Sequence, residues 1–225
     1  MTFHVAKECI DLGLRAGAVV FRNVHIADAS PALRAEVAQA VQAVRSRFAD
    51  PAAARAAPEV VAYHDILRAV GANPRREQPS VDRLLTLALK RGHLPVLNNL
   101  VDAYNLISIR SLCSLGAHNL DTLALPVELR LLSGSETFTP LGRDQPQVVS
   151  AGEYGYVDAR SRVLCRLDVV QADFSKVTAD TRNALLIFEG NTTHAPEMFR
   201  QVFRDAIDLV THHCGGTGAI VAWFR

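Results

Sequence analysis

Residues 96–121 read "VLNNLVDAYNLISIRSLCSLGAHNLD", and the change from a helical to a turn-like pattern within this stretch decides how the chain is interpreted. A helix is predicted over 96–112, after Pro95. At about 100° per residue, Asn98, Asp102 and Asn105 fall in one narrow stripe of this helix. Asn and Asp are poor helix formers, so this stripe indicates specific hydrogen bonds. Two interpretations stay open: the stripe shapes a pocket, or it ties the helix to neighbouring loops.

The end of the stretch places a histidine among residues that favour turns. Gly116 and Asn119 suit a turn, which would hold His118 between the helix and the following strand. Histidine is the side chain best suited to bind or position a water near neutral pH. A single histidine is also commonly structural, so His118 is a candidate for either role.

Upstream of this stretch the pattern is largely helical. One strand region and three helices are predicted, at 16–26, 30–48, 58–70 and 81–91. Ser30 and Ser80 are expected to act as N-caps of the first and third helices. The segment 50–60 is expected to be a connection.

Five basic residues gather around the third of these helices: Arg75, Arg76, Arg83, Lys90 and Arg91. Arg83 and Lys90 are seven positions apart and share a helix face. This cluster is a candidate for guiding the acceptor end of a tRNA, and the alternative is an ordinary solvated helix face. Because the net charge is only +1, tRNA binding would be local and sensitive to salt.

Downstream, the period of the apolar residues becomes typical of strands. "VELRLLS" at 127–133 alternates, a hairpin is predicted around 159–161, and "NALLIFEG" at 183–190 is a buried strand. A helix over 195–213 and a closing strand over 218–225 follow. Helices first and strands later, with a final strand–helix–strand unit, predict an α+β fold with a mixed β-sheet flanked by helices.

Two acidic residues of this region are candidates for a site. Glu189 lies at the carboxyl end of a predicted strand, where binding sites of α/β sheets often form. Glu153 lies in "AGEYGY", just before another predicted strand. Either could instead be a surface carboxylate at a strand end.

Several other classes of protein are disfavoured by the sequence. No stretch approaches the roughly 20 apolar residues of a membrane span, and the N-terminus lacks the apolar segment of a signal peptide. Four widely spaced cysteines are expected to be free thiols, so a cytoplasmic location is expected. There is no Gly-x-Ser-x-Gly motif. "GGTG" at 215–218 follows a helix and precedes a strand, the reverse of a nucleotide-binding loop.

Two further places in the sequence contain residues suited to nucleophilic or metal chemistry. Cys113 is near His118 in sequence but is expected in a helix core. His212, His213 and Cys214 lack a second ligand pair with zinc spacing, and histidines are favoured at a helix C-terminus by the dipole. We expect no metal and no cofactor.

Four collinear segments together resemble the B3/B4 domain of the bacterial phenylalanyl-tRNA synthetase β subunit. They are "LNNLVDAYNLISIRSLCSLGAHNLDTL", "VELRLLSGSETFTPLG", "GEYGYVDARSRVLCR" and "VTADTRNALLIFEG". The family's matching pieces are an Asp-x-x-Asn helix, a turn with a histidine and an aspartate, an arginine-bearing strand with a Gly-Glu pair, and a Thr-Arg-Asn strand. The resemblance covers about residues 95–215.

The resemblance implies a single B3/B4-like domain over 1–225, with an N-terminal strand and helices in 1–94 and the family core in 95–225. The chain lacks the other synthetase segments, so a freestanding B3/B4 protein is expected. In the family this domain hydrolyses the ester of tyrosine mistakenly attached to phenylalanine tRNA. His118 matches the family's editing histidine. The place of the family's tyrosine-reading glutamate falls near Ile187, and the nearest acid is Glu189.

The expected function is therefore a trans-editing aminoacyl-tRNA hydrolase, acting on tyrosine or a related aromatic amino acid. His118 and Glu189 are the expected catalytic residues, with Glu189 also reading the side chain. Asn98, Asp102, Asn105 and Glu153 are expected to bind the substrate. The expected partner is a misacylated tRNA, with no DNA and no membrane partner. The alternative is a noncatalytic module of the same fold that binds tRNA or an amino acid.

Overall fold

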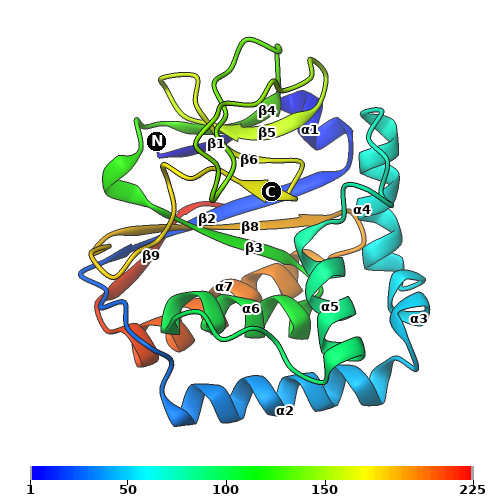
Figure 1. The fold of residues 1–225 in the computed structure, drawn as a ribbon, viewed down its shortest axis with the longest axis vertical. Coiled ribbons are helices and arrows are strands. Elements are labelled where there is room, and N and C mark those ends of the chain that lie inside the picture. The colour runs from blue at the N-terminus through cyan, green and yellow to red at the C-terminus, as the bar shows by residue number, and fades with distance from the viewer. Residues whose placement is uncertain (1, 224–225) are drawn as a thin grey trace.

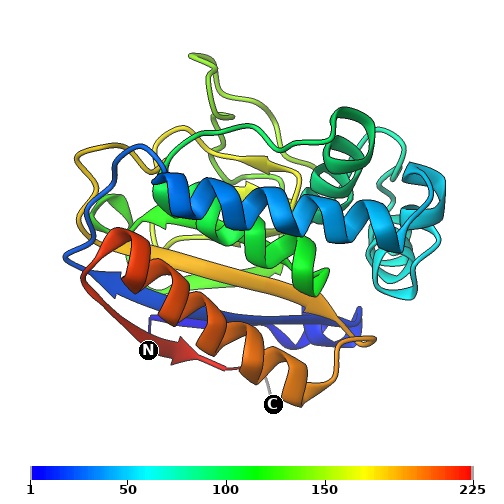
Figure 2. The same cartoon turned by 90° about the horizontal axis from the view of Figure 1, so that it is seen from below.

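The computed structural model describes residues 2–223 and is built in layers (Figure 1). A five-stranded sheet lies on one side of a four-stranded sheet, and helices α6 (Asn99–Ser111) and α7 (Pro196–Cys214) cover the other side. Helix α2 (Pro31–Arg47) forms the outermost layer across α6, as the view from below shows (Figure 2). The architecture is α+β, as predicted, with the strands divided between two sheets.

The four-stranded sheet is antiparallel throughout. Its strands, in spatial order, are β3 (Ser114–Asn119), β8 (Ala184–Asn191), β2 (Leu14–Arg22) and β9 (Thr217–Ala222). Side chains alternate along each strand. In β8, Leu186 and Phe188 join the core on the helix side, whereas Leu185 and Ile187 join the core between the sheets. Both faces of β8 are buried, which explains its almost continuous apolar sequence.

The five-stranded sheet is mixed. Its strands, in spatial order, are β1 (Phe3–Val5), β4 (Val127–Leu131), β5 (Tyr154–Val157), β6 (Val163–Arg166) and β7 (Val170–Gln171). Only β1 and β4 pair in parallel. The hairpin predicted around 159–161 is confirmed as β5–β6. The predicted closing strand is β9, and residues 224–225 of that prediction lie outside the described residues.

The remaining helices are short or surround one end of the sheets. They are α1 (Lys7–Asp11), α3 (Pro51–Arg55), α4 (Pro58–Ala69), α5 (Ser80–Arg91) and a 3-10 turn, η1 (Leu120–Thr122). The predicted cap of α2 is confirmed, because the Ser30 hydroxyl accepts from the N–H of Leu33 at 3.1 Å. The predicted cap of α5 is wrong: Pro79 holds that position and Ser80 is the first helical residue.

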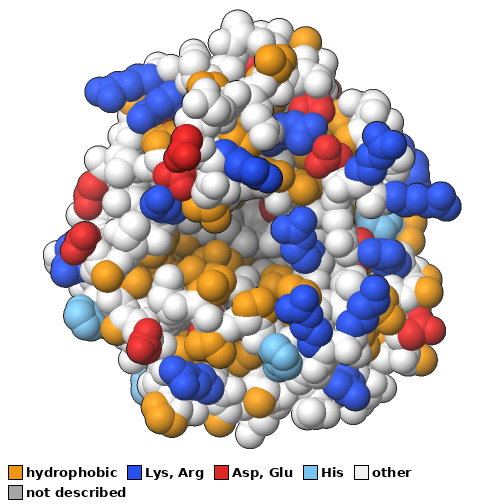
Figure 3. Space-filling model, viewed as in Figure 1, with side chains coloured by type: hydrophobic (Ala, Val, Ile, Leu, Met, Phe, Trp, Pro, Cys, Tyr) orange, Lys and Arg blue, Asp and Glu red, His pale blue; other side chains and the backbone are white. Residues whose placement is uncertain are grey.

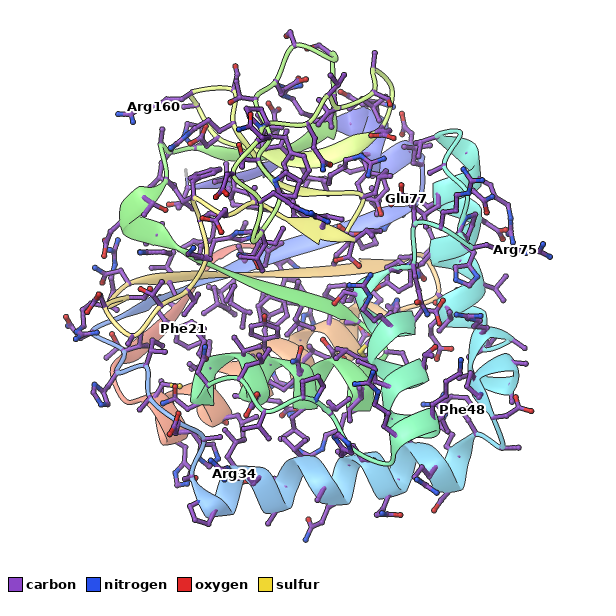
Figure 4. All side chains as sticks on the ribbon, in the orientation of Figure 1. Phe21, Arg34, Phe48, Arg75, Glu77 and Arg160 are labelled. Atoms are coloured by element: carbon purple, nitrogen blue, oxygen red, sulfur yellow. The ribbon has the colours of Figure 1, made fainter. Side chains whose placement is uncertain are left out.

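Helix α3 was expected to be a connection. The Asp50 side chain accepts from the N–H of Ala53 at 2.8 Å and Pro51 follows it, so both signals of a helix start are present. The main core lies between the four-stranded sheet and the helices. It includes Phe21 from β2 and Phe48 at the end of α2 (Figure 4).

Candidate functional site

A cavity of about 200 Å³ opens beside the edge strand β3, between the two sheets, the start of α5 and the middle of α6. Its lining comes from strands β3, β5, β6, β7 and β8, from the β6–β7 turn and from α5 and α6. Figure 3 shows the molecule hollowed in this region, between the strands and the helices. The hollow brings together His118, Glu189 and Asn105, which are far apart in the sequence.

Strand β3 supplies one wall of the cavity. Leu115 and Ala117 belong to the helix-side core, so Ser114, Gly116 and His118 project from the opposite face into the cavity. The prediction of a turn at His118 is wrong, because this residue pairs with Leu185 in the sheet. A Cβ on Gly116 would meet nothing within 4 Å, so this glycine leaves open space in the middle of the cavity.

His118 is a neutral hydrogen-bond donor in this setting. Burial lowers the pKa of His118 to about 3. The side-chain nitrogen of Gln171 donates to the Ala117 carbonyl at 3.0 Å, which identifies it as the amide NH2 group. The same nitrogen lies 3.3 Å from His118 Nδ1, and the Ser175 hydroxyl lies 2.9 Å from Nδ1. Nδ1 therefore accepts, and the single ring proton of the neutral imidazole is on Nε2.

Glu189 lies at the other end of the same cavity. Its side chain is buried, and the hydroxyls of Tyr154 and Tyr156 donate to Oε1 (3.2 Å) and Oε2, respectively. The Tyr63 hydroxyl donates to the backbone carbonyl of Glu189 at 2.5 Å. Burial raises the pKa of Glu189 to about 7, although the two side-chain hydrogen bonds act to lower it.

A second carboxyl group, that of Asp168, shares this end of the cavity. Leu167 and Asp168 are the central residues of a β-turn within the β6–β7 connection, which the N–H of Val169 closes by donating to the Arg166 carbonyl at 2.9 Å; their φ values are 55° and 54°. This left-handed pair is the geometry of a type I′ hairpin turn, for which Asn-Gly is the favoured sequence. Burial, followed by the charge of Glu189, raises the pKa of Asp168 well above its usual range. The sequence interpretation missed Asp168, because Leu-Asp is an unusual pair for such a turn.

The sheet register separates the two ends of the cavity. Ser114 is the residue of β3 opposite Glu189, and His118 lies four positions further along. At about 3.3 Å per residue, and about 5 Å between strands, the backbones of His118 and Glu189 are about 14 Å apart. The two side chains line one cavity but do not meet at one atom.

The three residues of the predicted polar stripe of α6 have two different roles in the structure. Asn98 is the N-cap, and its side chain accepts from the N–H of Val101 at 2.9 Å. Asp102 accepts from the N–H of Leu97 at 3.0 Å, so these two residues tie the helix to its own start. Asn105 lines the main cavity and also, with Asp102, a second cavity of about 140 Å³ against α2.

Glu153, the fourth predicted substrate-binding residue, is held by an arginine. Arg166 donates to both of its carboxylate oxygens, at 2.6 and 2.7 Å, and also contacts Glu77 at 3.3 Å. Glu153 is not among the residues that line the main cavity. This ion pair ties β6 to the segment that precedes β5.

The five predicted tRNA-binding residues are all exposed. Arg83, Lys90 and Arg91 lie on α5, whose first residue, Ser80, lines the cavity. None of the five side chains forms an ion pair with any residue between 2 and 223. Basic side chains gather on the α5 side of the hollow (Figure 3), and Arg75 extends away from the protein at that edge (Figure 4).

Comparison with known proteins identifies the fold family. The sequence profile of the B3/4 domain family matches residues 62–215, which is more than half of the chain. The chain belongs to the B3/4 domain family. The recognition drawn from the sequence is therefore confirmed. The match also includes most of α4 and all of α5, upstream of the segments that carry the resemblance.

A solved structure shows the same fold. An N-terminal fragment of the phenylalanyl-tRNA synthetase β subunit from Pyrococcus horikoshii superimposes with a TM-score of 0.52 at 13% sequence identity. The alignment covers 96% of this B3/4 chain and 50% of that fragment, so the chain spans about half the length of its neighbour. At this identity the likeness shows the fold alone. A search of curated proteins by sequence found no match.

Residues 2–223 of this B3/4 protein contain neither a metal-binding cluster nor a membrane-spanning helix. No group of three or more His, Cys, Asp or Glu side chains there is arranged to hold a metal ion. His213, one of the three residues considered as zinc ligands, contacts Glu36 at 3.2 Å. Within the same residues, no helix is both long and apolar enough to cross a membrane. The four cysteines are free, as predicted.

Proposed function

We propose that this B3/4 protein is a trans-editing hydrolase that removes a wrongly attached amino acid from tRNA. The observation that carries the proposal is the single cavity lined by His118 at one end and Glu189 at the other. A cavity of about 200 Å³ has room for one aminoacyl group, with the ester at the His118 end and the side chain towards Glu189. Tyrosine on phenylalanine tRNA, the substrate implied by the family, is the first ester to test.

Hydrolysis of an aminoacyl ester needs only a positioned water and a donor to the carbonyl oxygen, because the ester is already activated. Since Nδ1 of His118 accepts from Gln171, its Nε2–H is available to donate to the ester carbonyl or to a water. Such a donor stabilises the negative charge that develops on the carbonyl oxygen when water attacks. With a pKa of about 3, His118 does not take up a proton near neutral pH, so its role is to position and polarise.

The basic side chains along α5 give the proposal a site for the tRNA. From Ser80 at the cavity to Arg91 at the far end, this helix is about 17 Å long. The free cations at Arg83, Lys90 and Arg91 can therefore contact phosphates near an acceptor end whose ester is in the cavity. Contacts of this kind are sequence-independent and weaken with added salt.

Deacylation by the purified protein, measured on a panel of charged tRNAs, tests the proposal. We expect hydrolysis of at least one misacylated tRNA and a loss of about a hundredfold in His118→Ala, the cost of removing one donor to the developing oxyanion. His25→Ala serves as a matched control, since His25 is exposed and does not line the cavity. No deacylation of any ester, or an unchanged rate in His118→Ala, contradicts the proposal.

A noncatalytic binding module is the second candidate. It is favoured by the neutral, proton-bearing Nε2 of His118, which cannot accept a proton from water. Thermal-shift measurements with amino acids and with tRNA separate the two functions, because a bound ligand stabilises the folded state. A ligand that stabilises the protein while no charged tRNA is hydrolysed supports the binding module.

A further inference from the structure

The far end of the cavity holds two carboxyl groups without a counter-ion. Asp168 and Glu189 both line it, and both are at least nine-tenths buried. None of the described residues that line the cavity is Lys or Arg, and its one histidine is neutral. The nearby Arg166 is engaged with Glu153 and Glu77. Buried carboxyl groups are costly unless something compensates for them.

Asn105 is an independent sign that a ligand completes this site. Its side chain is only 8% exposed and lines the cavity. The amide forms no hydrogen bond with any residue that the structure describes, and its atoms are open to a cavity rather than enclosed by protein. Buried amides are normally bonded, so an Asn at a cavity wall with free donors and acceptors is placed for a ligand or for water.

Two neighbouring carboxyl groups favour a ligand with a cationic group over a ligand with a neutral hydroxyl. One carboxylate is enough to accept from a hydroxyl, and a second acid beside it only disfavours ionisation of the first. A cation is attracted by both groups and allows both to ionise. Each Glu189 oxygen accepts from one phenol, that of Tyr154 or of Tyr156, and keeps a second lone pair for a ligand donor.

The length of the cavity sets the length of the ligand. The backbones of His118 and Glu189 are about 14 Å apart along the sheet. Both side chains project from the same face of the sheet, so their ends are separated by a similar distance. Hydrogen bonds of about 3 Å at either end then leave about 8 Å between the ester and the group that meets the acids. A chain of about six single bonds spans this distance. The middle of the cavity, at Gly116 and Ile187, is open and apolar.

We propose that Asp168 and Glu189 bind the terminal ammonium group of a long aliphatic side chain, of the kind found in lysine. The ammonium donates hydrogen bonds to both carboxylates and to the amide oxygen of Asn105. The placement of the ester at His118 rests on the proposed function, whereas binding of the ammonium group does not.

The other titratable groups near the acid pair do not supply the missing charge. Tyr154 and Tyr156 face it from β5, and burial raises the pKa of both well above the usual range. Cys165 faces it from β6 with a pKa raised by burial, and Tyr63 approaches from α4 through the Glu189 carbonyl. Cys9 of α1 is also a neutral thiol, because burial raises its pKa to about 12. All of these groups are neutral near pH 7, so the ligand is the source of positive charge.

Isothermal titration with two isosteric amides tests the proposal. L-lysinamide carries the side-chain ammonium, and L-2-aminoheptanamide has a methyl group in its place. We expect lysinamide to bind about tenfold more tightly or better, and this preference to be lost in Asp168→Asn. Asparagine tolerates the left-handed backbone at position 168, so this variant keeps the turn. Asp180→Asn, which removes an exposed carboxyl remote from the cavity, is the matched control and should keep the preference.

Three results overturn the proposal: equal binding of the two amides, no binding of lysinamide at millimolar concentration, or tighter binding of L-tyrosinamide than of lysinamide. Its failure is distinguishable from failure of the proposed function. If lysinamide binds and no charged tRNA is hydrolysed, the ammonium site stands and the editing function fails. If esters are hydrolysed with no preference for an ammonium side chain, editing stands and the ammonium site fails.

Discussion

Glu189 makes the stability of this protein depend on pH in a direction opposite to that of most carboxylates. The unfolded carboxyl has a pKa near its ordinary value of 4.5, and the folded one is raised to about 7 by burial. Between these values the folded state holds a proton that the unfolded state has lost. The free energy of unfolding therefore falls as pH rises through this window, and it levels off above about pH 7.

The magnitude follows from the two pKa values. Their difference, at about 1.4 kcal/mol per pKa unit, corresponds to about 3 kcal/mol of stability lost between about pH 4.5 and 7. Glu189→Gln removes this titration. It also removes the charge that raises the pKa of Asp168, which adds to the effect in the same direction. For a chain of this size, 3 kcal/mol is about 6 to 12 °C in melting temperature.

The assay is thermal unfolding of the wild type and of Glu189→Gln at a series of pH values from 5 to 8.5. Part of the effect lies below pH 5, so we expect the melting temperature of the variant, relative to wild type, to rise by about 5 to 10 °C across that series. Changes in hydrogen bonding to Tyr154 and Tyr156 shift the variant by a constant and do not affect this slope. Glu136→Gln is the control. Glu136 has its pKa lowered to about 2, mainly by hydrogen bonds from Ser133 and Arg130 that outweigh desolvation, so its titration lies below the range measured. Parallel curves for wild type and Glu189→Gln would refute the reasoning.

Three further predictions concern the same cavity. Gly116→Val should fill open space in the cavity without a clash, so the melting temperature should stay close to wild type. Ligand binding or deacylation should fall by about a hundredfold, because the side chain occupies the ligand's place. A normal rate would show that ligands bind elsewhere. Gln171→Glu should move the ring proton of His118 from Nε2 to Nδ1 and raise the pKa of His118, because a carboxylate accepts from Nδ1–H. Nitrogen NMR shifts of the imidazole measure both the tautomer and the pKa. An unchanged Nε2–H tautomer would contradict the hydrogen bond from Gln171 to Nδ1. Tyr63→Phe should lower the free energy of unfolding in urea by about 1 to 3 kcal/mol, because a buried backbone carbonyl and N–H lose their partner; a neutral effect would mean that water replaces the hydroxyl.

The sequence predicted the elements well where periodicity and end signals agree. Helix α2 carries an apolar stripe, a serine cap and a proline at its start, and the structure confirms all three. Strand β3 was misread because Gly116 and Asn119 are turn formers in isolation. Pairing with β8 overrides that local preference, and Gly116 serves the cavity rather than a turn.

The candidate site was predictable in part, and the reason lies in sequence distance. His118 and Glu189 were nominated separately, and strand pairing brings them to one cavity. Asn98 and Asp102 share a predicted stripe with Asn105, but the helix begins at Asn99, three residues later than the predicted start at 96. The N-terminal backbone groups of α6 therefore use the first two side chains. Helix capping and ligand binding both use Asn and Asp side chains, so the sequence pattern does not distinguish the two roles.

Asp168 shows why the chemistry of the cavity could not be read from the sequence. Its approach to Glu189 depends on a tight turn in which both central residues adopt left-handed backbone conformations, and neither is glycine. Such conformations cost about 1 to 2 kcal/mol each, and in a hairpin Asn-Gly would avoid most of that cost. The turn instead keeps an acid where burial and a neighbouring carboxyl both oppose its ionisation. The Asp168 carbonyl accepts from the N–H of Ser80 at 3.1 Å, which ties the turn to the start of α5, but this backbone contact does not require an acidic side chain. The proposed cationic ligand would account for the carboxyl group itself, because it would bind between the two acids.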